Sequence, residues 1–152
     1  MRAALILILT GCAAGPAPPA DPPSPYAELL HGATRLQVRS GGLCHRTPAD
    51  ERTLLTVNDP AMVRAVADCL RIPPRGLDFE ITRCRCCGDP TLEFFKEEAL
   101  LVAISLHHGT RVRSDHLGDE ELTADSAEAL CRWLALRGIA KPEEDRRKIR
   151  SR

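Results

Sequence analysis

The stretch PTLEFFKEEALLVAISLHH, residues 90–108, consists of two apolar segments on either side of the short charged stretch KEE. Both segments are rich in Leu, Val, Ile and Phe, a composition that favours β-strands. A short polar connection of this kind joins neighbouring antiparallel strands. We therefore predict a β-hairpin over residues 90–108, with its charged turn at residues 96–98.

Other segments also indicate strands, from their composition or from the alternation of apolar and polar residues. In TRLQVRS (34–40), for example, Leu36 and Val38 alternate with polar residues. The remaining predicted strands are RTLLTVN (52–58), GLDFEIT (76–82) and GTRVRSD (109–115). Together with the hairpin they would form one antiparallel sheet.

Two helices are predicted from capping residues and from helical spacing. Asn58 or Asp59 is suited to cap a helix that has Pro60 at its first position. Apolar residues then recur at helical spacing: Met62, Val63, Val66, Cys69 and Leu70. Thr123 would cap the last helix, which ends at Gly138. Its buried face would consist of Ala127, Leu130, Cys131 and Leu134. A shorter helix is expected over residues 26–32.

The predicted order of elements is β-β-α-β-β-β-(β)-α. The economical arrangement is an α+β fold, an antiparallel sheet of four to six strands with two helices packed on one face. Residues 26–140 are long enough for a single domain with one core. We interpret GDEE (118–121) as a solvated loop, and we expect the charged tail KPEEDRRKIRSR (141–152) to be disordered.

The composition excludes some classes of partner. Lys plus Arg and Asp plus Glu number 21 each, so the chain has no basic field for a nucleic acid. It has three Phe, one Tyr and one Trp, which leaves little aromatic surface for stacking sugars or bases. The core must therefore consist mostly of Leu, Val, Ile and Ala.

The N-terminus has the layout of a secretory signal, with Arg2 ahead of an apolar run over residues 3–9. This run is too short to span a bilayer, which needs about 20 residues. The following LTGC (9–12) resembles the lipobox of bacterial lipoproteins. The resemblance implies a signal peptide over residues 1–11. It also implies that Cys12 is linked to diacylglycerol and that its new amine is acylated, for example with palmitate.

The residues after the lipobox indicate location and a tether. Ala13, rather than Asp, follows the cysteine, which in that family implies the outer membrane, facing the periplasm, in a diderm source. In other bacteria it implies the outer face of the cytoplasmic membrane. GPAPPADPPSP (15–25) contains six of the twelve prolines. Residues 12–25 are therefore predicted to be a lipidated cysteine and its Pro-rich tether, in which residues 15–25 form a semi-rigid stalk of roughly 30 Å that buries no core.

Six cysteines remain once Cys12 is set aside: Cys44, Cys69, Cys84, Cys86, Cys87 and Cys131. An even number outside the cytoplasm predicts a disulfide framework, for which fifteen pairings are formally possible. Cys69 and Cys131 fall on the apolar stripes of the two helices. They could pair with each other or remain buried thiols.

The cysteine-rich stretch RCRCCGD offers other pairings. In an extended strand, Cys84 and Cys86 would face away from the core and Cys87 towards it. This arrangement suits a staple from this segment to Cys44 in the glycine-rich loop. A direct bridge between the neighbours Cys86 and Cys87 would be strained.

Metal binding is the first alternative, because thiolates and imidazoles are ligands of zinc and copper(I). The candidate ligands are Cys84, Cys86, Cys87, His107 and His108, with Cys44, His45 and His116 in reserve. Adjacent histidines on a strand point to opposite faces, so at most one of His107 and His108 is expected in a given site. The spacing CRCC lacks the two-residue gap of zinc knuckles.

A thiol–disulfide oxidoreductase is the second alternative. A reactive dithiol usually lies in a C-x-x-C motif at a helix start, where the helix dipole lowers the pKa of the thiol. Here Gly88-Asp89-Pro90 leads into a strand instead. A hydrolase that uses Cys44 or Cys87 with a remote histidine has no local signature.

The sequence therefore favours a non-enzymatic envelope lipoprotein with a small disulfide-containing domain. Its role would be binding or structural, with a membrane contact through the lipid and an envelope protein as the undetermined partner. No catalytic residue is predicted, and no cofactor unless zinc or copper binds. The cysteine-rich turn, SLHHG (105–109) and the last helix together resemble uncharacterised bacterial proteins, so this resemblance implies no function.

Overall fold

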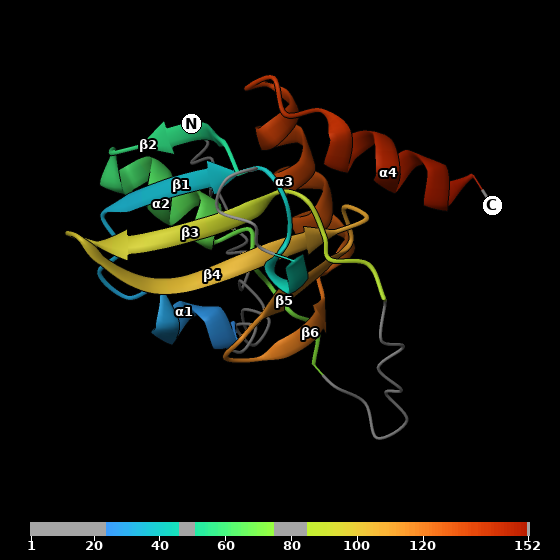
Figure 1. Cartoon of the computed structure of the whole chain (residues 1–152). Helices are drawn as coiled ribbons and strands as arrows, with labels where there is room; N and C mark the ends of the chain where they lie inside the picture. Colours follow the sequence, from blue (N-terminus) through green and yellow to red (C-terminus); the bar gives the residue numbers. More distant parts are fainter. Residues whose placement is uncertain (1–23, 46–50, 75–84, 152) are drawn as a thin grey trace, which may run out of the picture.

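The structure, a computed structural model of the 152-residue chain, describes residues 24–45, 51–74 and 85–151. Its centre is a six-stranded antiparallel sheet in the order β2-β1-β3-β4-β5-β6 (Figure 1). The strands are β1 (Arg35–Arg39), β2 (Thr53–Val57), β3 (Thr91–Lys96), β4 (Ala99–His107), β5 (Arg111–Ser114) and β6 (Gly118–Glu121). The predicted α+β fold is confirmed. The predicted strand GLDFEIT (76–82) lies outside the described residues.

The hairpin predicted from residues 90–108 is formed by β3 and β4, at the middle of the sheet. Phe94 lies opposite Val102, and Leu92 lies opposite Ile104. These four side chains are buried, and burying a large apolar side chain stabilises the fold by roughly 1.5–3 kcal/mol. The hairpin therefore fixes both the register and the core of the sheet.

The main helices are α1 (Pro25–Leu29), α2 (Pro60–Ala67), α3 (Ala124–Ala135) and α4 (Lys141–Arg150), with a short 3₁₀-helix η1 (Leu43–His45). The Asp59 carboxylate caps α2 by accepting from the Ala61 N–H at 2.9 Å. Thr123 caps α3 by accepting from the Ser126 N–H at 3.3 Å. Both predicted caps are therefore confirmed.

Helices α2 and α3 lie against the same side of the sheet (Figure 1). The core between these helices and the sheet is mostly aliphatic, apart from the buried rings of Tyr26 and Phe94. It includes Leu36, Val38, Val63, Val66, Ile104, Leu106, Leu130 and Leu134. The predicted inner face of the last helix, including Ala127 and Cys131, is buried as expected.

Two predictions at the C-terminal end were wrong. GDEE (118–121) is the edge strand β6 rather than a loop, and its Asp119 lies opposite Arg113 of β5. The tail predicted to be disordered contains α4 instead, and the Arg146 guanidinium donates to the Glu128 carboxylate at 3.1 Å. Neither segment has an apolar pattern: β6 is attached by its pairing with β5, and α4 is attached in part by the Arg146–Glu128 ion pair.

The face of the sheet opposite α2 and α3 carries polar side chains. One cross-strand row on this face consists of Arg39, Thr91, Ser105, Arg113 and Asp119. At the end of β4, η1 packs over this face, on the side away from α2 and α3 (Figure 1). No helix in the described ranges is long and apolar enough to cross a membrane.

Candidate functional site

The site lies where the chain enters β3 and leaves β4. Because these strands are antiparallel, the residues before β3 meet the residues after β4. Two hydrogen bonds continue the pairing beyond the strand, since the Asp89 N–H donates to the Leu106 carbonyl and the Leu106 N–H donates to the Pro90 carbonyl, both at 2.9 Å. Cys86 is thereby brought to the end of β4.

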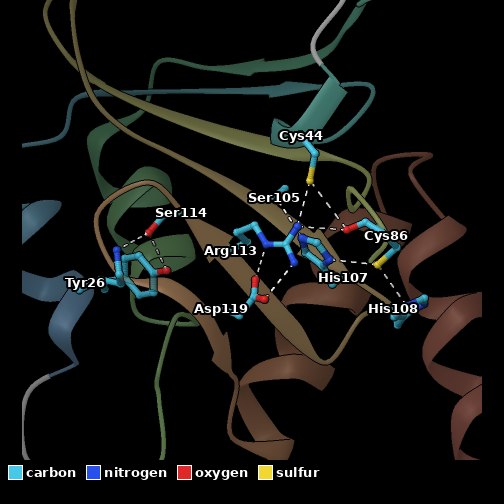
Figure 2. A network of polar contacts seen from close by, with 10 residues as sticks. Tyr26, Cys44, Cys86, Ser105, His107, His108, Arg113, Ser114 and Asp119 are labelled. Carbon is cyan, nitrogen blue, oxygen red and sulfur yellow. Dashed lines mark hydrogen bonds and ion pairs between the residues drawn. The ribbon is translucent and has the colours of Figure 1, made fainter. Parts of the chain in front are cut away.

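Cys86 contacts both histidines (Figure 2). Its Sγ lies 3.1 Å from His107 Nδ1 and 3.3 Å from His108 Nε2. His107 is the last residue of β4, and His108 has a positive φ of 51°. This left-handed backbone interrupts the alternation of an extended strand, so that both imidazoles reach one sulfur. The expectation that at most one of these histidines joins a site was therefore wrong.

His107 is held from its other side by Ser105. The Ser105 hydroxyl lies 2.9 Å from His107 Nε2, and the His107 side chain is only 2% exposed. Burial, and after it the neighbouring charge of Arg113, lower the pKa of His107 to about 4. The imidazole is therefore neutral near pH 7, with one ring nitrogen facing the sulfur and the other facing the hydroxyl.

Gly88 closes the turn over this imidazole. Its φ is +74°, and a Cβ there would lie 2.8 Å from His107 Nε2 and 3.0 Å from the Leu106 carbonyl oxygen. A side chain at this position would be strained and would collide with a buried ring. Glycine is thus required for the Cys86 turn to pack on β4.

Arg113 connects the separate parts of the site (Figure 2). Its Nε and Nη2 donate to the Asp119 carboxylate, the latter at 2.9 Å. Its Nη1 donates to Cys44 Sγ at 2.9 Å and to the Cys86 carbonyl at 3.1 Å. The hydrogen bonds from Arg113 hold the pKa of Asp119 below its usual value. One guanidinium therefore links η1, the Cys86 turn, β5 and β6.

Helix α4 begins beside the same cluster. A Cβ on Gly109, the residue after His108, would lie 2.3 Å from the Pro142 carbonyl oxygen. Lys141 donates to Asp145 at 2.6 Å, and this hydrogen bond raises the pKa of Lys141. Negative charge on Asp89 or Cys86 also raises the pKa of Lys141. The first turn of α4 therefore adds a cation near the sulfur.

The glycine-rich loop packs closely on the cysteine pair. A Cβ on Gly42 would lie 1.6 Å from the Cys87 carbonyl oxygen, and the Cys44 thiol faces the Cys86 carbonyl at 3.9 Å. Cys44 therefore lies beside the Cys86–Cys87 segment, as predicted. No two sulfurs of the described residues lie at bonding distance, so the disulfide framework stays a prediction.

The other candidate cysteines lie elsewhere. Cys69 donates to the Ala65 carbonyl within its own helical segment, and Cys131 of α3 donates to the Gly109 carbonyl, both at 3.3 Å. Burial raises the pKa of Cys69, and it raises that of Cys131 to about 11. These two cysteines behave as packed thiols, and the structure does not bring them together.

A metal site is not preformed in the described residues. No group of three or more His, Cys, Asp or Glu side chains within the described ranges is arranged to hold a metal ion. The candidate ligand Cys84 lies outside these ranges, as does the side chain of His45, while His116 lies in the turn between β5 and β6.

Sequence reasoning found the cysteines and histidines of the cluster but missed Ser105, Arg113 and Asp119. Only the register across β4, β5 and β6 puts these three residues in one row. A groove of about 720 Å³ between α1, α2 and residues 71–74 contains none of these side chains.

The arrangement can hold or deprotonate one thiol, since it surrounds a partly exposed sulfur with two imidazoles and places two cations close by. It can also present a soft donor set for a metal. No protein-family model, no curated protein and no solved structure matches the chain.

Proposed function

We propose that the protein is a lipid-anchored envelope protein that displays a small α+β domain on a Pro-rich tether and has a binding role. The observation that carries the anchoring is LTGC (9–12), preceded by Arg2 and a short apolar run. Two or more acyl chains are sufficient for stable membrane attachment. The partner would be another component of the envelope.

The polar face of the sheet, opposite α2 and α3, supports a binding role of the domain. Cys44, Cys86, His107 and His108 gather at one end of this face, and Arg113 connects them. A domain that served only as a spacer would not need a neutral, buried histidine beside a partly exposed thiol. We therefore place the binding role at this cluster.

The anchoring is tested by comparing the wild type with Cys12→Ala and with the control Cys69→Ala. Metabolic labelling with a fatty acid and membrane fractionation are expected to show lipid on the wild type and on Cys69→Ala. The Cys12→Ala variant should be unlabelled and should keep its signal peptide. If this variant were processed normally and still sedimented with membranes, the lipoprotein assignment would fail.

Metal binding is the second candidate function, favoured by the contact of both imidazoles with the Cys86 sulfur. In a tetrahedral zinc site, bond lengths of about 2.0 and 2.3 Å separate N and S donors by roughly 3.5 Å. The sulfur–nitrogen distances of 3.1 and 3.3 Å are slightly shorter, which is the spacing of hydrogen bonds. Binding would require the donors to move apart by a few tenths of an ångström.

This candidate is tested by the metal content of the full chain after dialysis. One equivalent of zinc or copper in the wild type and in Cys69→Ser, and its loss in Cys86→Ser, would support a metal site. A metal-free wild type that also fails to take up added zinc or copper(I) would exclude it.

A further inference from the structure

Cys86 differs from the other described cysteines in what surrounds its sulfur. Two imidazole nitrogens lie within hydrogen-bonding distance, at 3.1 and 3.3 Å. The sulfur is partly exposed, whereas Cys131 is fully buried and donates to a backbone carbonyl. Reactive thiols lie in such partly exposed, electropositive surroundings, and structural thiols lie in apolar ones.

Two cations lie near this thiol, and each is paired with a carboxylate. The Arg113 guanidinium donates to the Cys86 carbonyl at 3.1 Å, and Lys141 at the start of α4 is close enough for the charge of Cys86 to affect it. Asp119 pairs with Arg113 and Asp145 pairs with Lys141, so both cations are fixed in place. A thiolate at Cys86 would be stabilised by these charges.

The imidazole of His107 is oriented to stabilise a thiolate at Cys86. Its Nε2 faces the Ser105 hydroxyl at 2.9 Å, which can donate to it and thereby place the ring proton on Nδ1. A proton on Nδ1 points at the Cys86 sulfur and stabilises the anion. Ser105 is in this sense a positioning residue. The exposed His108, 3.3 Å from the sulfur, can accept the thiol proton.

We propose that Cys86 is a nucleophilic thiol that undergoes thiol–disulfide exchange with small disulfides, with His108 accepting its proton and His107 stabilising the thiolate. The Cys86 sulfur attacks one sulfur of the disulfide, forms a new S–S bond and breaks the old one. The departing half leaves as a thiolate and takes up the proton. Cys86 is oxidised to a mixed disulfide and the departing sulfur is reduced, so no other oxidant is needed.

This proposal rests on the cluster and is independent of the lipid anchor. Failure of the exchange would leave the anchoring untouched, and failure of the anchoring would leave the exchange untouched. The competing metal-binding candidate uses the same sulfur, so the experiment includes a chelator.

The experiment uses the full-length chain in mild detergent, reduced under native conditions and desalted. The probe is glutathione disulfide at pH 7. Remaining thiols are trapped by alkylation at timed intervals, and modification at each cysteine is measured by peptide mass spectrometry. We expect Cys86 to react about tenfold or more faster than its neighbour Cys87 and than Cys69 and Cys131. In denaturant the rates should become similar.

His108→Asn is the decisive variant, because asparagine tolerates the positive φ of 51° at this exposed position. We expect the rate at Cys86 to fall at least about fivefold with an unchanged thermal midpoint. Ser105→Ala should lower the rate at Cys86 less than His108→Asn does, and Cys87→Ser should leave that rate unchanged. Equal rates at Cys86 and Cys87, an unaltered rate in His108→Asn, or reactivity that appears only after chelation would each overturn the proposal.

Discussion

The Cys86 sulfur lies 3.1 Å from Nδ1 of His107, 21 residues further along the chain. The β3–β4 hairpin produces this contact, because its register places Thr91 opposite Ser105 and thus the residues before β3 beside the end of β4. Gly88 then lets the turn lie directly on the imidazole. The contact is therefore a consequence of the sheet register.

Lowering the pH should destabilise the fold through His107. Its pKa is about 4 in the folded protein, below the value of about 6.5 expected after unfolding, so the unfolded chain binds more protons between these values. Desolvation is the main cause. The charges of Arg113, His108 and Arg111 act in the same direction, and that of Asp119 opposes them.

The contribution of the neutral, buried His107 to stability should therefore be fully present above pH 6.5 and should be lost as the pH falls towards 4. Between pH 7.5 and 5.0 the free energy of unfolding should decrease by about 2 kcal/mol. Urea unfolding at both pH values measures this, and His107→Gln should remove most of the difference. A wild-type change below about 0.5 kcal/mol would contradict the assigned burial of the neutral ring.

Substituting Gly88 should cost more than substituting Gly118. Both glycines have a positive φ, +74° and +72°, so alanine is strained at either position by about 1–2 kcal/mol. A Cβ at Gly118 meets nothing within 4 Å, whereas one at Gly88 lies 2.8 Å from His107 Nε2. Gly88→Ala should lose roughly 1–3 kcal/mol more than Gly118→Ala in urea unfolding. Equal losses would show that the turn does not pack on the ring.

The ion pair of Arg113 and Asp119 should contribute measurably to stability. Their side chains are only 21% and 16% exposed, and the contact is bidentate. A double-mutant cycle with Arg113→Gln and Asp119→Asn should give a coupling energy of about 1–2 kcal/mol.

The matched control is the bidentate pair of Arg35 and Glu98, in which the Glu98 side chain is 89% exposed. Its coupling should stay below about 0.5 kcal/mol. A coupling at Arg113 no larger than that of the control would mean that the guanidinium does not hold the site together.

Arg146 should attach α4 to the domain. Its side chain is 9% exposed and donates to the Glu128 carboxylate and to the Ala124 carbonyl, whereas the side chain of the adjacent Arg147 is 71% exposed. Arg146→Ala should cost about 1–2 kcal/mol and should speed hydrogen exchange across residues 141–150. Arg147→Ala should stay within about 0.5 kcal/mol of the wild type. Slow exchange that survives in Arg146→Ala would point to another attachment.

The fold could be predicted where local signals were strong. The alternation in β1, the cap at Asp59 and the cap at Thr123 depend on near neighbours in the sequence, and the structure confirms them. The strand β6 and helix α4 could not be predicted, since both are highly charged. Their order comes from partners outside the segments themselves: Arg113 is six residues from Asp119, and Glu128 is 18 residues from Arg146.

The cysteines and histidines of the site were predictable from the sequence, but its other polar residues and its geometry were not. The cysteines and histidines are visible as clusters, yet the alternation rule separated His107 from His108. The left-handed backbone at His108 instead brings both imidazoles to the same sulfur. In the sequence His-His-Gly, only the glycine hints at such a backbone. The contribution of Arg113 depends on register across three strands and on the approach of η1.

The most direct test of the proposed function is the intact mass of the protein extracted from its membrane. We predict a chain that begins at Cys12 and carries a diacylglycerol with at least one further acyl chain. A chain that retains residues 1–11, or one that is cleaved elsewhere and carries no lipid, would contradict the proposal that this domain is displayed from a lipid anchor.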